Sequence, residues 1–451
     1  MFTIQFLLNI FPSYQGQIQS NIKVEHVITD SRDVKKNALF IPIVGDTFNG
    51  HDFIDQAIEN GAIATLWDEK EKVPSNVPSS FVFFFVSDTL KAMQQLANNY
   101  RNDVDPIVIG ITGSNGKTTT KDLVKSIFQT ERKTHATKGN FNNHIGLPIT
   151  ILNMPRDTEI LVVEMGMNNF GEIDLLTNIA QPNYAIITNI GESHIEHLGS
   201  REGIAKAKLE IRNGLKQNGY LIIDGDEPLL KLLHNDKNII TCGFDKINDV
   251  RITNVQFHEQ SSLFQISNEV YTVPLLGKHH AKNATLAIAI AKQLGYDRET
   301  IQQGLDTLEH TTMRFEWSKG KNGASIINDA YNASATSMKA AIEVVKQIEG
   351  FKHKGLVLGD ILELGTYSKQ MHESVADTIE KPIDFVFTFG EHAIEITNRL
   401  KEKQPSIISK HCVTKEEVIN LLQNYLQEET LLLFKASRGM KFEEIIQKIM
   451  E

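Results

Sequence analysis

The feature that most restricts the fold of this chain is a glycine-rich segment between an apolar run and a helical run. Gly110-Ile-Thr-Gly-Ser-Asn-Gly-Lys-Thr-Thr-Thr120 follows Ile107–Ile111, which predicts a buried strand, and a helix is predicted from Lys117 to Gln129. A phosphate-binding loop requires this order of strand, turn and helix, because the turn and the helix N-terminus aim backbone N–H groups at an anion. The segment therefore predicts a phosphate loop inside an α/β domain.

The chemistry of the loop predicts a nucleotide site. Gly113 and Gly116 permit a sharp turn, Lys117 would reach the outer phosphates, and Thr118 would hold Mg²⁺. The spacing is the shorter G-x-x-G-K-T form, since Ile111 stands where the common pattern has its first glycine. The loop also occurs in GTPases, motors, kinases and ligases, so it leaves the reaction open. The predicted ATP-binding residues of the loop are Gly113, Ser114, Asn115, Gly116, Lys117, Thr118 and Thr119.

The length predicts several domains, each with its own hydrophobic core, since 451 residues at about 150 per domain correspond to three domains. Residues 1–104 alternate apolar runs with helical stretches, and a polar linker is expected at Arg101–Pro106. Residues 105–313 contain strands that are apolar on both faces and alternate with helices, which indicates a mostly parallel sheet covered on both sides. Residues 314–451 repeat this α/β rhythm.

Charge and composition exclude several classes of protein. The formal net charge is −10, which argues against binding nucleic acid through bulk charge. Cys242 and Cys412 are the only cysteines, so no disulfide framework is expected and a reducing compartment fits. The apolar N-terminus has no Lys or Arg before Lys23, which argues against a secretory signal, and no apolar run approaches membrane-spanning length. We expect a cytoplasmic monomer without membrane insertion.

Several segments carry a family resemblance. TGSNGKTTT resembles the phosphate loop of the Mur ligases and their folylpolyglutamate synthase relatives. The resemblance implies a small UDP-sugar-binding N-terminal α/β domain, a central ATP-binding domain and a C-terminal Rossmann-like ligase domain. The other segments that resemble the family, in the expected order, are Val27–Arg32, Ala38–Gly45, Asn49–His51, Gly139–Pro148, Asn189–His194, Ala205–Lys208 and Gly277–Asn283.

Within the family, four further segments resemble the member that joins D-alanyl-D-alanine to UDP-N-acetylmuramoyl-tripeptide. They are Val163–Met167, Asn328–Ala333, Gly359–Gly365 followed by His372, and Lys435–Arg438. The resemblance implies an ADP-forming ligase of peptidoglycan synthesis that works through an acyl phosphate. The alternatives are a sibling ligase that adds the third peptide residue, and folylpolyglutamate synthase. The muramoyl-type N-terminal residues that precede the phosphate loop argue against folylpolyglutamate synthase. A nucleotide-gated switch protein would need a guanine-selecting N-K-x-D motif, and no segment fits it.

The resemblance also implies a metal centre with two Mg²⁺ ions. Thr118, Glu164 and His194 are its expected ligands, together with Lys206 as a carbamoylated lysine; Lys117, Glu164, His194 and Lys206 are the expected catalytic residues. A neutral lysine amine that adds CO₂ becomes a carboxylate, which can bind a cation. Taken alone, His194 fits a loop histidine equally well, and Lys206 and Lys208 fit a solvated basic face. The family pattern K-A-[KR] favours Lys206 over Lys208.

Polar side chains in the loops complete the expected site. Asparagine commonly serves turns or caps helices, and Asp30–Arg32 also fits a polar turn. Arg438 could contact either a phosphate or a substrate carboxylate. Further ATP contacts implied by the resemblance are Asn283, Arg314, Asp329 and Asn332. The implied UDP-sugar contacts are Ser31, Arg32, Asn49, His51, Asn140, Asn142 and Asn143.

Overall fold

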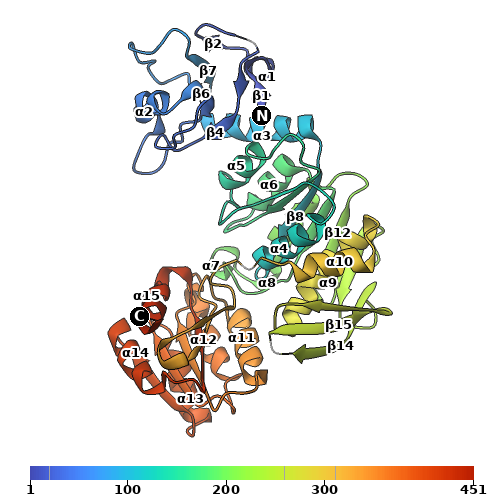
Figure 1. Ribbon diagram of the computed structural model, residues 1–451, viewed down its shortest axis with the longest axis vertical. Coiled ribbons are helices and arrows are strands. Elements are labelled where there is room, and N and C mark those ends of the chain that lie inside the picture. The colour runs from blue at the N-terminus through green and yellow to red at the C-terminus, as the bar shows by residue number, and fades with distance from the viewer. Residues whose placement is uncertain (20, 259, 310, 451) are drawn as a thin grey trace.

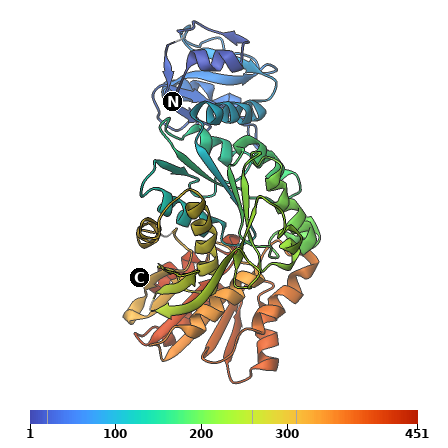
Figure 2. The same ribbon diagram turned by 90° about the vertical axis from the view of Figure 1, so that its right-hand side faces the viewer.

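The computed structural model describes residues 1–19, 21–258, 260–309 and 311–450, which form three α/β units along one long axis (Figure 1). The view turned by 90° shows the same order, with the N-terminal unit at one end and the C-terminal unit at the other (Figure 2). Each unit has a principal sheet of its own. The predicted three-domain α/β fold is therefore confirmed, and we propose the domain boundaries at 104/105 and 313/314.

The N-terminal unit is a five-stranded sheet in the order β2-β7-β6-β5-β4, parallel except for β2. Helix α1 explains the apolar N-terminus, because Thr3 caps it by accepting from the Phe6 amide and its Ile4 and Leu7 are buried. The elements are β1 (Phe2–Thr3), α1 (Ile4–Ile10), β2 (Tyr14–Gln15), β3 (Lys23–Val24), β4 (His26–Ile28), β5 (Ala38–Phe40), η1 (Gly50–Phe53), α2 (Ile54–Glu59), β6 (Ala62–Asp68) and β7 (Val82–Val86).

Helix α3 (Thr89–Val104) joins this unit to the next one, where the sequence predicted a linker. The prediction of a polar linker at Arg101–Pro106 is wrong, because the first four residues of this segment are helical and the Arg101 side chain is buried. Arg101 Nη2 donates to Gln181 Oε1 at 2.8 Å, and the Tyr100 hydroxyl donates to the Met154 carbonyl at 2.9 Å. These contacts attach α3 to the central unit, so its end is a packed interface.

The central unit is a nine-stranded sheet in the order β16-β15-β14-β13-β12-β11-β8-β10-β9. Strands β8 to β13 run parallel, and β14, β15 and β16 form an antiparallel extension. Alternate residues of β8 enter different cores: Val108 packs on the side of α5 and α6, while Ile109 and Ile111 pack on the side of α4 and α9. Both faces are therefore covered, as the apolar strands predicted.

The bounds of the elements in the central unit place the phosphate loop between β8 and α4. They are β8 (Ile107–Thr112), α4 (Lys117–Phe128), β9 (Thr134–Ala136), α5 (Gly146–Leu152), β10 (Ile160–Glu164), α6 (Glu172–Ala180), β11 (Tyr184–Ile187), α7 (Ile195–Leu198), α8 (Arg201–Leu209), η2 (Glu210–Arg212), β12 (Tyr220–Asp224), η3 (Pro228–Leu233), β13 (Ile239–Gly243), β14 (Val250–His258), β15 (Ser261–Ile266), β16 (Glu269–Val273), α9 (Lys278–Gln293) and α10 (Arg298–Asp306).

The C-terminal unit is a six-stranded sheet in the order β17-β18-β22-β19-β20-β21, parallel except for β17. Its elements are β17 (Glu316–Lys319), η4 (Lys321–Gly323), β18 (Ser325–Asn328), α11 (Ala335–Gln347), β19 (His353–Gly359), η5 (Gly365–Tyr367), α12 (Ser368–Ala376), β20 (Phe385–Phe389), α13 (Ile394–Lys403), β21 (Ile408–Cys412), α14 (Lys415–Leu422), η6 (Gln423–Tyr425), β22 (Thr430–Lys435), η7 (Arg438–Met440) and α15 (Glu443–Met450).

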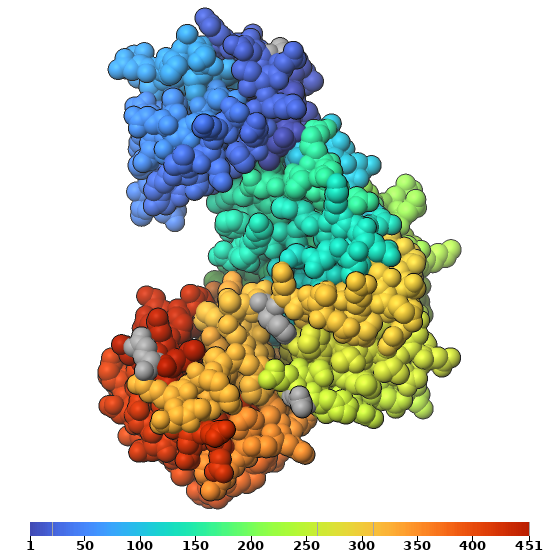
Figure 3. Space-filling model, viewed as in Figure 1, coloured from blue at the N-terminus to red at the C-terminus, as the bar shows by residue number. Residues whose placement is uncertain are grey.

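The surface shows how the units meet. In Figure 3 the N-terminal unit overhangs a wide open space that separates it from the C-terminal unit on this face, and the central unit bridges the two. Among the helices of the described ranges, none combines the length and the apolar character needed to cross a bilayer.

Candidate active site

The phosphate loop depends on glycine at two positions. Gly113 has φ +150° and Gly116 has φ +79°, values that side-chain-bearing residues rarely adopt. A Cβ atom on Gly113 would lie 1.8 Å from Thr188 Oγ1, and one on Gly116 would lie 2.8 Å from Asn283 Nδ2. The loop therefore packs its backbone directly against neighbouring side chains, which only glycine permits.

Two residues at the end of β11 hold the loop in place. Asn115 N donates to Asn189 Oδ1 at 3.0 Å, and Asn189 Nδ2 donates back to the Asn115 carbonyl at 3.0 Å. Thr188 Oγ1 donates to the same carbonyl at 2.6 Å. Neither residue is among the site residues that the sequence predicts. Their position offered a signal, since β11 pairs with β8 and the carboxyl ends of parallel strands meet at one edge.

Replacing Gly113 with alanine is expected to destabilise the central unit by about 3 kcal/mol, because the new methyl group meets the Thr188 hydroxyl in a strained backbone. Gly295→Ala is the matched control: Gly295 also has positive φ (+84°), but a Cβ there would meet no heavy atom within 4 Å. The control should cost about 1 kcal/mol from backbone strain alone. Thermal unfolding of both variants measures the difference, and equal shifts would contradict the packing argument.

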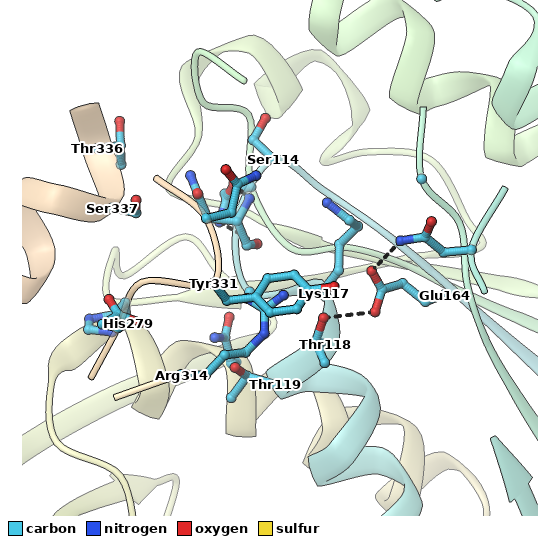
Figure 4. Close-up of a pocket in the computed structure, with 18 of the residues that line it drawn as sticks. Ser114, Lys117, Thr118, Thr119, Glu164, His279, Arg314, Tyr331, Thr336 and Ser337 are labelled. Atoms are coloured by element: carbon cyan, nitrogen blue, oxygen red, sulfur yellow. Dashed lines mark hydrogen bonds between the residues drawn. The ribbon is translucent and has the colours of Figure 1, made fainter. Parts of the chain in front are cut away.

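Lys117, Thr118 and Glu164 converge beside the loop (Figure 4). Lys117 Nζ donates to the Gly113 carbonyl at 2.8 Å, and burial lowers the pKa of this lysine although the Glu164 carboxylate opposes the effect. Thr118 Oγ1 donates to Glu164 Oε2 at 2.9 Å, and Asn142 Nδ2 donates to Glu164 Oε1 at 2.8 Å. A lysine, a hydroxyl and a carboxylate thus face the space in front of the loop.

That space is a cavity of about 420 Å³ between the central and C-terminal units. Its walls include the phosphate loop, the carboxyl end of β10 and the start of α11, where Thr336 and Ser337 lie across from the loop in Figure 4. Most of the expected ATP and metal residues meet here. The predicted residues that line the cavity are Ser114, Asn115, Gly116, Lys117, Thr118, Thr119, Asn140, Asn142, Asn143, Glu164, His194, Asn283, Arg314, Asp329 and Asn332.

Arg314 is held by its neighbours in the chain. Met313 and Phe315 on either side have φ of +60° and +54°, and the Phe315 amide donates to Asp329 Oδ1 at 3.2 Å. The Arg314 guanidinium lies 4.3 Å from the centroid of the Tyr331 ring (Figure 4). Strained residues that persist around a charged side chain are typical of functional sites. The connection between the two units therefore presents a cation to the cavity.

Two further residues of this wall, Lys435 and His279, are not among the site residues that the sequence predicts. Asp329, one of the predicted ATP contacts, pairs with Lys435 Nζ at 2.5 Å, so its carboxylate is already bound to a cation. His279 lines the cavity, and burial lowers its pKa to about 4 despite Asp329. An imidazole that stays neutral can stack on the base of a nucleotide, or accept a hydrogen bond from it, without carrying charge. The Gly277–Asn283 motif contained His279, but nothing in the spacing marked it.

The oxygen ligands near the loop fit a magnesium ion. Thr118 and Glu164 supply a hydroxyl and a carboxylate beside the predicted phosphate position, and Mg²⁺ prefers oxygen and uses few protein ligands when phosphates complete its shell. In the described part of the chain, no group of three or more His, Cys, Asp or Glu side chains could hold a metal. These residues therefore suit a Mg²⁺ ion that is bound together with a nucleotide better than a Zn²⁺ ion held by protein ligands alone.

His194 lies at the same cavity but contacts the C-terminal unit. Its Nδ1 is 2.5 Å from Glu363 Oε2, and hydrogen bonding to His194 lowers the pKa of the Glu363 carboxyl. His194 has φ +64°, which turns the chain sharply before α7. Other contacts join the same two units: Ser334 Oγ donates to Asn115 Oδ1 at 3.0 Å, and Thr336 Oγ1 donates to Glu192.

The two candidate lysines of α8 lie in different environments. Lys206 is exposed, with its Nζ 5.8 Å from the centroid of the Phe170 ring. Lys208 is 1% exposed, and burial together with the charge of Lys117 lowers its pKa well below the usual range. The structure therefore does not bring Lys206 to the phosphate loop, whereas it holds Lys208 close enough to feel the Lys117 charge. Neither lysine lines the cavity.

The four predicted UDP-sugar residues of the N-terminal unit lie away from this cavity. Arg32 is exposed and pairs with Asp30 at 2.6 Å, and Ser31 Oγ donates to Gln56 Oε1 at 2.6 Å. Asn49 accepts from the His51 amide at 3.0 Å, so it caps η1, and the His51 ring packs edge-on against Trp67. These contacts shape the loops of the N-terminal unit, as a polar turn would.

Asn140, Asn142 and Asn143 of the Gly139–Pro148 segment all line the cavity. Asn142 reaches Glu164, as described above, and Asn140 lines the cavity. Asn143 Oδ1 accepts from the Ile145 and Gly146 amides, so it orders the turn that begins α5. Asn283 is buried against Gly116, where it supports the loop.

Three family models match successive parts of the chain. Residues 23–101 match "Mur ligase family, catalytic domain", residues 111–291 match "Mur ligase middle domain", and residues 313–438 match "Mur ligase, glutamate ligase domain". Each match falls on one of the three sheets described above.

Individual relatives are similar to this chain over nearly its whole length. The chain is 47% identical over 444 residues to the UDP-N-acetylmuramoyl-tripeptide–D-alanyl-D-alanine ligase of Bacillus subtilis (strain 168), covering 98% of this chain and 95% of the relative. A crystal structure of MurF from Acinetobacter baumannii is similar with a TM-score of 0.87 and 31% identity, covering 100% and 98% of the two chains. MurF ligase from Thermotoga maritima in complex with ADP is similar with a TM-score of 0.83 and 29% identity, covering 94% and 97%.

Proposed function

This chain belongs to the Mur ligase family, and on that premise we propose how its residues carry out the family's reaction. The chain is an ATP-dependent ligase of peptidoglycan synthesis that joins D-alanyl-D-alanine to UDP-N-acetylmuramoyl-tripeptide. The single structural observation that carries the proposal is the cavity between the central and C-terminal units, in which the phosphate loop, Glu164 and Arg314 face one another.

The first step we propose is a reaction between two anions, the tripeptide carboxylate and ATP. The terminal carboxylate of the tripeptide attacks the γ-phosphorus of ATP, an acyl phosphate forms, and ADP leaves. Lys117 and Arg314 line the space that the phosphates would fill, and both are cations that offset the repulsion between carboxylate and phosphate. The backbone N–H groups of the loop add fixed donors that need no reorganisation during the reaction.

The second step uses the amine of the dipeptide. Its lone pair attacks the acyl carbon of the acyl phosphate, a tetrahedral intermediate forms, and its collapse expels inorganic phosphate and leaves a new amide bond. The ammonium form of the amine first loses one proton to solvent, and the nitrogen loses a second proton, also to solvent, before the intermediate collapses to the neutral amide. The cavity is walled by two units, so water is restricted at the stage when an acyl phosphate would otherwise hydrolyse.

We propose that two Mg²⁺ ions assist, one at Thr118 and Glu164 and one at His194 and a carbamoylated lysine. Bound Mg²⁺ neutralises phosphate charge. We assign the carbamate to Lys208 in place of Lys206, because Lys208 is buried near Lys117 while Lys206 is exposed. A buried amine with a lowered pKa is more often neutral, and only the neutral amine adds CO₂.

We propose that the N-terminal unit holds the UDP part of the tripeptide substrate through its loops at Ser31–Arg32 and Asn49–His51. Support comes from their resemblance to the family's UDP-sugar domain and from the match of residues 23–101. The described contacts of these residues are internal to that unit, so the ligand would have to share or replace them. We also propose that the protein is cytoplasmic, which the two buried, unpaired cysteines support. We propose a monomer as well.

A nucleotide-release assay tests the function. We expect ADP release only when ATP, UDP-N-acetylmuramoyl-tripeptide and D-alanyl-D-alanine are all present, and none with a folate acceptor. With the tripeptide carboxylate labelled with ¹⁸O, one label should appear in inorganic phosphate, because the attacking oxygen leaves with the phosphoryl group. AMP with pyrophosphate would contradict the acyl phosphate route, and ADP release with folate would favour the folylpolyglutamate synthase alternative.

A further inference from the structure

Helix α4 carries a pair of charged residues, one turn beyond the phosphate loop, that the proposed reaction does not use. Lys121 and Asp122 have side chains that are 8% and 14% exposed, and Lys121 Nζ lies 2.7 Å from Asp122 Oδ1. Both line a cavity of about 450 Å³ between α4, β9 and the connection to the C-terminal unit. Among the described residues, none lines both this cavity and the ATP cavity. Any effect of the pair on the reaction must therefore pass through other residues.

The Lys121 side chain is anchored in the central unit. Its Nζ donates to the carbonyl of Thr137, a buried residue that directly follows β9, at 3.1 Å. The Thr137 hydroxyl accepts from the Glu164 amide at 3.0 Å, and the Thr137 amide donates to the Val162 carbonyl at 3.0 Å. These bonds attach the ammonium group to the end of the parallel sheet, so it presents a fixed charge to Asp122.

The second oxygen of Asp122 holds the connection between the central and C-terminal units. Asp122 Oδ2 accepts from Thr311 Oγ1 at 2.6 Å, and Thr311 precedes Arg314 by three residues. A hydrogen bond to an ionised carboxylate is shorter and stronger than one between neutral groups. Lys121 contacts one oxygen and Thr311 the other, so the carboxylate has a defined orientation. Asp122 thus links the phosphate-loop helix to the segment that carries Arg314.

The same segment is anchored to the C-terminal unit next to Arg314. The Met313 amide donates to Glu316 Oε2 at 2.7 Å, and the Met313 carbonyl accepts from the Tyr331 amide at 3.2 Å. Within the described ranges, Arg314 Nε is buried without a hydrogen-bond partner. The direction in which this cation points therefore depends on the two anchored parts of its segment.

We propose that Asp122 is a positioning residue, which fixes the Arg314 cation opposite the phosphate loop by way of Thr311. Lys121 holds the Asp122 carboxylate in place. This inference rests on the proposed function. Lys117 begins the same helix, so the contact sets the distance between the two cations that face the phosphates. A charged group that is misplaced by about 1 Å can cost a reaction about 10²-fold in rate.

Stability alone gives little reason for this pair of charges. Two apolar side chains of similar size often stabilise a protein as well as a buried ion pair does. An ion pair differs from them in its directed hydrogen bonds, and here those bonds reach Thr137 on one side and Thr311 on the other. The pair is therefore suited to holding two segments in one geometry.

Thr311→Val tests the inference, because valine resembles threonine in shape but lacks the hydroxyl group. We expect kcat/KM for ATP to fall about tenfold and the Kd of a non-hydrolysable ATP analogue to rise severalfold, since Arg314 loses its fixed position. Thr311→Ser keeps the hydroxyl and should remain within about twofold of wild type. Asp122→Ala should show the same loss as Thr311→Val. If Asp122→Ala is unstable, the valine variant still decides, because it leaves the ion pair intact.

A double-mutant cycle with Arg314→Ala separates positioning from a general loss of structure. Arg314→Ala alone should lower kcat/KM for ATP by about 10²-fold. If Thr311 acts through Arg314, adding Thr311→Val to this variant should change neither kcat/KM nor the Kd of the analogue by more than about twofold. A role in stability alone would lower activity by the same factor in both backgrounds, and that result would overturn the proposal.

Glu309→Ala is the matched control. Glu309 pairs with Lys125 on the next turn of α4 and belongs to the same connection, but its side chain is 81% exposed. Exposed ion pairs contribute little, so this variant should retain near wild-type activity and analogue binding. A tenfold loss in Glu309→Ala would contradict a specific role for Asp122, because any contact between α4 and the connection would then have the same effect.

Failure of this inference and failure of the proposed function give different results. If wild-type enzyme releases ADP in response to its two substrates but the losses in Thr311→Val and Arg314→Ala multiply, the positioning role is wrong and the function stands. If wild-type enzyme shows no substrate-dependent ADP release, the proposed function fails. The cycle on analogue binding then still decides the positioning role, since it requires no acceptor.

Discussion

Lys117→Ala is expected to lower the rate of ligation by about 10³-fold or more while the protein stays folded. The cation faces the space in which two anions must meet, and no other lysine of the phosphate loop can replace its charge. Stability should change little, because removing the side chain also removes the cost of burying an ammonium group. Steady-state ADP release and the thermal unfolding midpoint measure the two effects.

Lys125→Ala provides the matched control for this variant. Lys125 lies on the same helix, α4, but pairs with Glu309 and does not line the ATP cavity. It should retain near wild-type turnover. Turnover near the wild-type level in Lys117→Ala, or an equal loss in both variants, would remove the assignment of this segment as the phosphate loop.

Lys208→Ala is expected to lose activity by about 10²-fold or more, whereas Lys206→Ala should remain close to wild type. The loss follows if the carbamate of Lys208 supplies a cation ligand that no neighbouring side chain can replace. Short carboxylic acids should partly restore Lys208→Ala by filling the vacated space. They should not restore Lys208→Arg, because the bulky guanidinium stays in place and stays positive.

A measurement independent of turnover identifies the modified lysine. Enzyme equilibrated with ¹³C-labelled bicarbonate should show a carbamate signal by ¹³C NMR in the wild type and in Lys206→Ala, and no such signal in Lys208→Ala. Full activity in Lys208→Ala together with loss in Lys206→Ala would return the role to Lys206. Absence of the signal from wild-type enzyme would remove the carbamate altogether.

The phosphate loop and the α/β fold could be predicted from the sequence because their determinants are local. The apolar run of β8, the glycines at 113 and 116 and the start of α4 follow one another along the chain, so adjacent residues specify strand, turn and helix. Likewise, strands without polar faces require helices on both sides of a sheet. The predicted linker at Arg101–Pro106 is wrong because polar residues can also end a helix that packs against another unit, as α3 does.

The choice between Lys206 and Lys208 depends on the rotation of a helix. Lys206 and Lys208 are two positions apart, which corresponds to a rotation of about 200° around the helix axis. Helix α8 can therefore bury only one of the two side chains. Ile204 and Lys208 are four residues apart and both buried, which places them on one face. This periodicity is present in the sequence, but it indicates the inner face only once the surrounding core is known.

The phosphate loop, the three α/β units and the family could be recognised without a structure, since each depends on residues that are neighbours in the chain. Which side chains of different units meet became clear only from the folded chain. Glu363 reaches His194, Ser334 reaches Asn115, and Arg438 faces a cavity that three strand ends enclose. These contacts depend on how the C-terminal unit packs against the central one. That packing is set by the summed shape and charge of two surfaces, and no short stretch of sequence contains it.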